Sequence, residues 1–109
     1  MLWVKRAVLA GFIAGFGASV AAQEQMTAGS LTTNMNADER ISFLAGIVEG
    51  LATARYYADD KQPEGRKCIY DWFYRTDGTL RKVYAAFDRY PDQFPGPIMA
   101  VLIRSKCGG

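Results

Sequence analysis

The sequence predicts an all-α protein, a compact bundle of about four helices closed by one disulfide. Three observations support this fold class. From residue 37 onward, apolar residues recur at intervals of three and four in successive segments. Clusters of Pro, Gly and acidic residues separate these segments, and no segment shows a convincing strand alternation of apolar and polar residues. The chain of 109 residues contains two cysteines, Cys68 and Cys107.

Residues 1–22 have the pattern of a secretory signal peptide. Lys5 and Arg6 form a short positive region, an apolar run follows over 7–17, and small residues lead up to Ala22. A retained membrane anchor is the alternative, but the apolar run is shorter than the roughly 20 residues that span a bilayer. We therefore expect a periplasmic or secreted protein with no membrane insertion after signal cleavage.

Export changes both the charge and the state of the cysteines. Without Lys5 and Arg6 the formal net charge falls from +2 to 0. Nucleic acids and anionic membranes require a local excess of Lys and Arg, so neither is an expected partner. In an oxidising compartment two cysteines are more often paired than free, which predicts a Cys68–Cys107 disulfide. A redox-active pair is the alternative, but such pairs normally need close spacing such as Cys-x-x-Cys.

Residues 23–36 are polar and poor in large apolar side chains. This composition predicts a flexible leader, in which Leu31 and Met35 could dock onto the body. The helical domain is expected to occupy residues 37–109.

The first helix of the domain is predicted over Ala37–Ala58. Asn36 can cap its first turn, while Glu39 can reach back to the amide of the cap residue. Its apolar face is formed by Ile41, Leu44, Ala45, Val48, Leu51 and Ala52. Gly46, Gly50 and Ala54 recur at intervals of four along this helix. We interpret them as a strip for close helix packing; glycines merely tolerated in a helix are the alternative.

A solvated turn is predicted over residues 59–67, which contain paired acids, Pro and Gly. Asp59, Asp60 and Glu64 could be taken for a cation site. They lack the register of a calcium-binding loop, and the sequence contains no histidine, so no metal site is expected.

A short aromatic helix is predicted over residues 66–75. In a helix, Ile69, Trp72 and Phe73 share one side, while Tyr70 and Tyr74 share another. A turn over 76–79 leads to a helix ending near Tyr90, and a last helix starts at Pro95 or Pro97 and ends at Cys107. The apolar faces of these two helices are formed by Leu80, Val83, Tyr84 and Phe87, and by Ile98, Met99, Val101 and Leu102.

The sequence carries no catalytic signature. It has no histidine for a triad or a zinc site, no phosphate-binding glycine loop and no dinucleotide fingerprint, so neither an enzyme nor a cofactor is expected. The remaining class of function is recognition of a protein partner. The aromatic residues exceed what a small core can readily hide, and the candidate partner surface consists of Tyr70, Trp72, Tyr74 and Tyr90. The alternative is that these residues fill the core.

One segment resembles a known family. Its pattern is F-x-x-G-(I/V)-V-(D/E)-(G/A)-L, matched here by Phe43-Leu44-Ala45-Gly46-Ile47-Val48-Glu49-Gly50-Leu51. The order of Cys68, Thr79-Leu80, Tyr90-Pro91-Asp92 and Cys107 is also similar to the Rap1a/Tai type of small exported proteins. This resemblance covers residues 37–109. It implies a four-helix, disulfide-bonded periplasmic protein, and an immunity function in which the chain binds and blocks a toxin delivered by type VI secretion.

Two other functions stay open. Small exported helical proteins with one disulfide include acid-stress chaperones of the HdeA type. Protonation of the 11 carboxylates would carry the exported chain from a net charge of 0 to +11, which would favour opening. An envelope structural protein without a dedicated partner is the third possibility. The expected partner is an effector toxin or a second copy of the chain.

Overall fold

The computed structural model of the chain describes residues 26–109, and the regular structure of this part is entirely helical. The elements are α2 (Ala28–Asn34), α3 (Ala37–Ala58), α4 (Glu64–Tyr70), the π-helix η1 (Asp71–Arg75), α5 (Thr79–Arg89) and α6 (Pro95–Cys107). The all-α prediction is confirmed, although the helix count was one too low because α2 had been expected as a leader. The predicted signal peptide, 1–22, and residues 23–25 lie outside the described residues.

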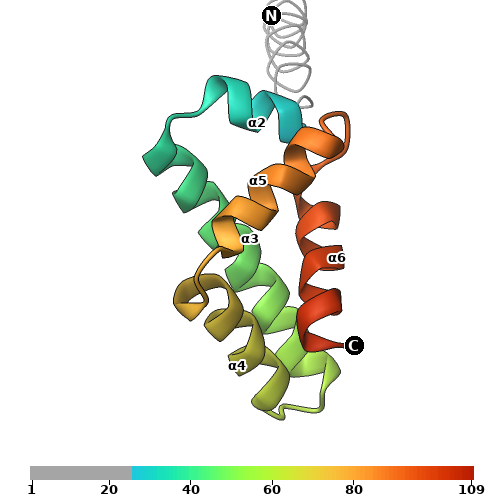
Figure 1. The fold of residues 1–109 in the computed structure, drawn as a ribbon. Helices are drawn as coiled ribbons and strands as arrows, with labels where there is room; N and C mark the ends of the chain where they lie inside the picture. Colours follow the sequence, from blue (N-terminus) through green and yellow to red (C-terminus); the bar gives the residue numbers. More distant parts are fainter. Residues whose placement is uncertain (1–25) are drawn as a thin grey trace, which may run out of the picture.

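α4 and α6 pack along α3, the longest helix, while α5 packs against α2 and α6. Figure 1 shows α4 and α6 beside the C-terminal half of α3, with α5 crossing nearer its N-terminal half and α2 lying over that end. The core between them is formed by Leu44, Val48, Ala52, Ile69, Trp72, Phe73, Val83, Phe87, Ile98, Met99 and Ile103, joined by Ala28 and Leu31 of α2. Among residues 26–109, no helix is both long enough and apolar enough to cross a bilayer.

The segment expected to be a flexible leader is helical over Ala28–Asn34. Thr27 and Ser30 form a reciprocal capping box, in which each backbone N–H donates to the hydroxyl of the other residue at 2.9 and 3.1 Å. This local pairing satisfies amides at the start of the helix that would otherwise face water. The flexible-leader prediction is therefore wrong for this part of residues 23–36.

Tertiary contacts hold α2 in place. Leu31 is wholly buried, as the docking hypothesis required, and Met35 packs against the core. The N–H of Ala28 donates to the carbonyl of Gln93 at 2.8 Å, and the N–H of Gly29 donates to that of Pro91 at 2.9 Å. Both acceptors belong to the connection between α5 and α6, so α2 closes the end of the bundle.

The predicted helix Ala37–Ala58 is confirmed at both ends. The N–H of Glu39 donates to Asn36 Oδ1 and the N–H of Asn36 donates to Glu39 Oε1, both at 2.9 Å. The buried face is narrower than predicted: Leu44, Val48 and Ala52 are wholly buried, whereas Ile41 is exposed. The helix starts where local capping dictates, and its tertiary contacts select which part of the apolar face is covered.

The close-packing interpretation of Gly46, Gly50 and Ala54 is wrong for residues 26–109. A Cβ placed on Gly46 or Gly50 would meet no atom within 4 Å, and Ala54 is exposed. The physical reason is the rotation of α3 about its axis. The strip lies on the side turned away from the buried Leu44 and Val48, so no other described helix covers it.

The predicted disulfide is confirmed and joins α4 to α6. Cys68 and Cys107 are bonded, with their Cα atoms 5.8 Å apart. Arg55 of α3 reinforces the same end of the molecule: its Nη1 donates to the carbonyl of Gly108 at 2.8 Å, and its Nε pairs with Asp59 at 2.7 Å. A cation at the carbonyl end of a helix is favourable, so Arg55 ties α3 to the terminus of α6.

Two further predictions need correction. α4 begins at Glu64, so the expected turn over 59–67 is shorter than predicted. Val101 is 64% exposed, while Ile103, which had not been assigned to the apolar face of the last helix, is buried. The rotation of α6 against its neighbours decides this, because both faces of that helix carry apolar residues. Thr79 is also buried, although it is polar.

Candidate functional site

The segment after Cys68 is α-helical as far as Tyr70 and continues as the π-helix η1, and its aromatic residues divide between two sides. Ile69, Trp72 and Phe73 point into the core. The Thr79 hydroxyl donates to the carbonyl of Trp72 at 2.6 Å, which satisfies a backbone acceptor of η1. This buried hydrogen bond explains why a threonine occupies a core position at the start of α5.

Tyr70 and Tyr74 lie on the opposite side of the segment, as the helical spacing predicted. Their ring centroids are 6.3 Å apart, and the Tyr74 ring meets Phe73 edge-on at 4.9 Å. The Tyr70 hydroxyl donates to Glu49 of α3 at 2.8 Å. The two tyrosines are therefore held in place, one by a hydrogen bond across the α3–α4 contact and one by a core ring beneath it.

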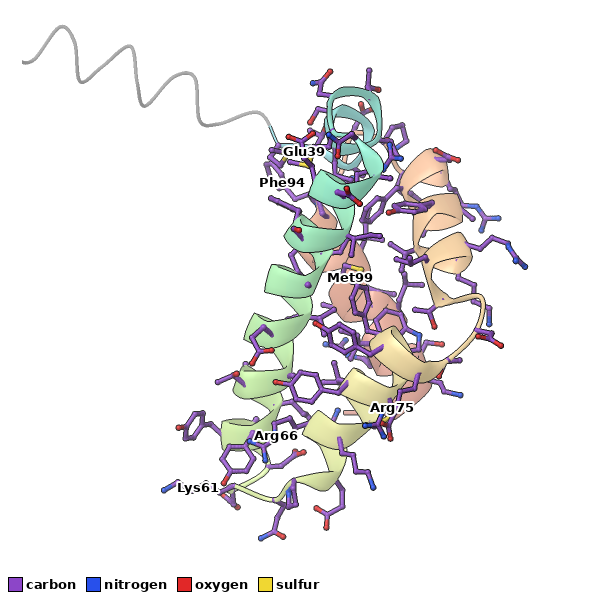
Figure 2. The ribbon with its side chains drawn as sticks, turned by 90° about the vertical axis from the view of Figure 1, so that its left-hand side faces the viewer. Glu39, Lys61, Arg66, Arg75, Phe94 and Met99 are labelled. Atoms are coloured by element: carbon purple, nitrogen blue, oxygen red, sulfur yellow. A yellow bond between two sulfur atoms is a disulfide. The ribbon has the colours of Figure 1, made fainter. Side chains whose placement is uncertain are left out.

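The same row continues toward the C-terminal end of α3. Arg66 stacks its guanidinium over the Tyr56 ring at 4.1 Å, and Tyr56 meets Tyr57 edge-on at 5.4 Å. We call this set the tyrosine surface, formed by Glu49, Tyr56, Tyr57, Arg66, Tyr70 and Tyr74. Figure 2 looks onto the side of the molecule where α3 and α4 lie next to each other, and Arg66 is labelled between them.

One solvent-exposed hydrogen bond, from Tyr70 to Glu49, sets the electrostatics of the tyrosine surface. The hydrogen bond to the Glu49 carboxylate raises the pKa of Tyr70 above its ordinary value, and partial burial and the negative charge of Glu49 act in the same direction. Tyr70 is neutral at physiological pH, and its hydroxyl donates a hydrogen bond to the Glu49 carboxylate. Tyr57 and Tyr74, by contrast, present 63% and 57% of their area to solvent.

The structure separates the four residues of the predicted partner surface. Tyr70 and Tyr74 belong to the tyrosine surface. Trp72 is only 6% exposed, and its ring shares the inward side of the segment with Ile69 and Phe73, so it does not belong to the tyrosine surface. Tyr90 is 52% exposed but lies at the far end of α5 from η1, so it is not part of the same patch.

Sequence reasoning missed Glu49, Tyr56, Tyr57 and Arg66 as members of the surface. Part of the signal was available, because Arg66, Tyr70 and Tyr74 follow one another at intervals of four and must share a helix face. The contribution of α3 was not available. It depends on how α3 and α4 pack, which places Glu49 and Tyr56 opposite that row.

The chemistry of this surface is that of contact and hydrogen bonding. It offers aromatic rings, hydroxyl groups, the Arg66 guanidinium group and the Glu49 carboxylate. Among residues 26–109, no group of three His, Cys, Asp or Glu side chains is placed to hold a metal ion. Comparison with protein-family models, with curated proteins and with solved structures finds no match to this chain.

Proposed function

We propose that the chain is a small exported binding protein that recognises a protein partner through the tyrosine surface. Tyrosine and arginine are the residue types that most often dominate the energy of protein interfaces, and this surface combines four tyrosines with Arg66. The single observation that carries the proposal is the pair of well-exposed rings, Tyr57 and Tyr74, flanking the two partly buried rings of the same row.

The arrangement of the side chains supports this role. Binding costs entropy when flexible side chains are immobilised, about 0.5–1.5 kcal/mol for each. Here the rings rest on one another, on Phe73 and on Arg66, and the Tyr70 hydroxyl is fixed by Glu49. The Cys68–Cys107 disulfide restrains the helix that carries half of them. Much of the ordering cost is thus met in the free protein.

The resemblance described above suggests the class of partner. An immunity protein protects the cell by covering the functional surface of a toxin. This role requires a rigid, preformed contact face and no catalytic activity. The proposed partner is therefore a toxin delivered by type VI secretion, and inhibition is by occlusion.

Co-expression tests this proposal. The chain is expected to restore growth to cells that export a toxin encoded beside it, and to bind that toxin in calorimetry. Tyr57→Ala and Tyr74→Ala are each expected to weaken binding about tenfold or more. A tenfold loss of affinity corresponds to about 1.4 kcal/mol of binding free energy, as expected for an important interface residue. Tyr90→Ala is the matched control, because Tyr90 is similarly exposed at a distant site.

Two results would contradict the proposal. One is failure to protect against any toxin encoded in its neighbourhood. The other is a toxin complex whose affinity falls with Tyr90→Ala and is unchanged by Tyr57→Ala and Tyr74→Ala, because the contact face would then lie elsewhere.

A further inference from the structure

A groove lies on a different side of α4 from the tyrosine surface, beside the disulfide. It consists of two adjoining hollows of about 380 and 180 Å³ that share Trp72, Thr76 and Lys106. We call it the Trp72 groove. The smaller hollow is completed by Lys82, Leu102 and Ser105, and its walls therefore come from η1, α5 and α6.

The indole of Trp72 brings an unpaired donor to this groove. Although its side chain is in the core, its ring N–H donates no hydrogen bond within residues 26–109. In this part of the chain, Arg40 Nε is the one fully buried side-chain nitrogen or oxygen atom that lacks a partner. The Trp72 nitrogen must therefore reach solvent, and Trp72 lines both hollows. A tryptophan N–H at such a site can donate a hydrogen bond to a bound ligand.

The charges around the smaller hollow are positive. Lys82 and Lys106 line it and no carboxylate does. The ion pairs of residues 26–109 join Arg55 to Asp59 and Arg75 to Asp71, so neither lysine is neutralised by a partner. The Ser105 hydroxyl likewise forms no hydrogen bond in this part of the chain. The unpaired polar groups of the smaller hollow are therefore hydrogen-bond donors, apart from the hydroxyl oxygens, which can also accept. Such a set of donors favours an anionic acceptor as the ligand.

The larger hollow differs in charge. Glu64 and Asp71 line it together with Lys67, and Asp71 already faces Arg75 at 3.5 Å. An anion entering the groove is thus directed toward the smaller hollow, while the larger one offers acceptors for the amide groups of a peptide. The apolar wall formed by Leu102 and the indole suits the methylene groups of an acidic side chain better than a bare inorganic anion.

We propose that the Trp72 groove binds an acidic segment of a protein, with one Glu or Asp carboxylate in the smaller hollow. In this complex the carboxylate accepts from the Trp72 N–H and the Ser105 hydroxyl, and Lys82 and Lys106 balance its charge. The site is separate from the tyrosine surface and does not depend on the function proposed for it. It gives the chain a second contact region for a partner that carries exposed acids.

Nuclear magnetic resonance of the exported chain, without the expected signal peptide 1–22, tests this inference directly. Of the two tryptophans in the sequence, Trp3 belongs to that signal peptide, so the indole N–H of Trp72 is the single tryptophan side-chain signal to follow. The probe is a capped peptide, Gly-Ser-Glu-Glu-Ser-Gly, and the matched control replaces each Glu with Gln. We expect a saturable shift of the Trp72 indole signal with the acidic peptide, weakened by added salt, and no shift with the control.

Substitutions locate the carboxylate. Lys82→Gln and Lys106→Gln are each expected to weaken peptide binding about two- to fivefold, as for a partly exposed ion pair. Lys61→Gln, on the turn after α3, is the control and should have no effect. All three lysines are exposed, so the variants should fold normally.

Three outcomes would overturn the inference. They are no shift at saturating acidic peptide, an equal shift with the glutamine peptide, and equal affinity for Lys82→Gln, Lys106→Gln and the Lys61→Gln control. The same titration is repeated with acetate in place of the peptide. If acetate shifts the Trp72 signal at the same concentrations as the peptide, the site binds free carboxylates and the assignment to a peptide segment is wrong.

Discussion

Replacing Gly46 and Gly50 of α3 with alanine is expected to stabilise the protein. Glycine in a helix interior is less favourable than alanine by about 0.5–1 kcal/mol, because it loses more backbone entropy on folding. At most helical glycines this gain is uncertain, because the added methyl group can clash. Here a Cβ at either position meets no atom within 4 Å, so nothing offsets the gain.

The two substitutions together should raise the free energy of unfolding by about 1–2 kcal/mol. For a domain of this size, each kcal/mol moves the melting temperature by about 4–8 °C, so the double variant should melt roughly 5–15 °C higher. Gly65→Ala provides a contrast of opposite sign. Its Cβ would lie 2.6 Å from both Arg55 Nε and Asp59 Oδ2, and the strain on that ion pair should lower the melting temperature.

Thermal unfolding followed by circular dichroism measures these shifts, at two protein concentrations that differ tenfold. A melting temperature of the Gly46→Ala/Gly50→Ala variant at or below that of the wild type would refute the reasoning. If, in addition, the wild-type melting temperature rises with concentration and that of the variant does not, the strip is a contact between two copies of the chain, and its small residues are needed there.

Three further predictions concern other parts of the fold. Reducing the Cys68–Cys107 disulfide, which spans 39 residues, should lower the free energy of unfolding in urea by about 3–4 kcal/mol; an unchanged midpoint would contradict the proposed restraint. Leu31→Ala should cost about 2–4 kcal/mol, because Leu31 is wholly buried and anchors α2; a loss below 1 kcal/mol would mean that α2 is not docked in solution. The raised pKa of Tyr70 favours its neutral form in the folded state, so stability from this group is present below about pH 10 and is lost as pH rises through the folded pKa. Glu49→Gln should shift the ultraviolet titration of Tyr70 to lower pH, and an unchanged curve would argue against the hydrogen bond.

The arrangement of the two candidate contact regions follows from α4 and η1. One side of this segment carries Tyr70 and Tyr74, and another side meets α6 through the disulfide and borders the Trp72 groove. Cys68 lines the Trp72 groove and belongs to the same helix as Tyr70, so the disulfide restrains both regions at the α4–α6 contact. A partner large enough to cover the tyrosine surface could therefore place an acidic loop in the groove without any change in the fold.

The sequence by itself determined the features that depend on local interactions. The start of α3 could be predicted because Asn36 and Glu39 satisfy each other's backbone amides, wherever the rest of the chain lies. The sides of the aromatic helix were predictable for a similar reason, because residues four apart share a face whatever they pack against. The pairing of Cys68 with Cys107 followed from their number and the expected oxidising compartment.

Tertiary structure decided the features that depend on how whole helices are rotated and docked. α2 is short and polar, and it is held by burial of Leu31 and by the carbonyl groups of a distant connection. The exposure of Val101 and of the Gly46–Gly50 strip depends on the rotation of α6 and α3, which local sequence does not fix. The tyrosine surface likewise required α3 and α4 to meet in one register, because only that packing brings Glu49 to Tyr70 and Tyr56 to Arg66.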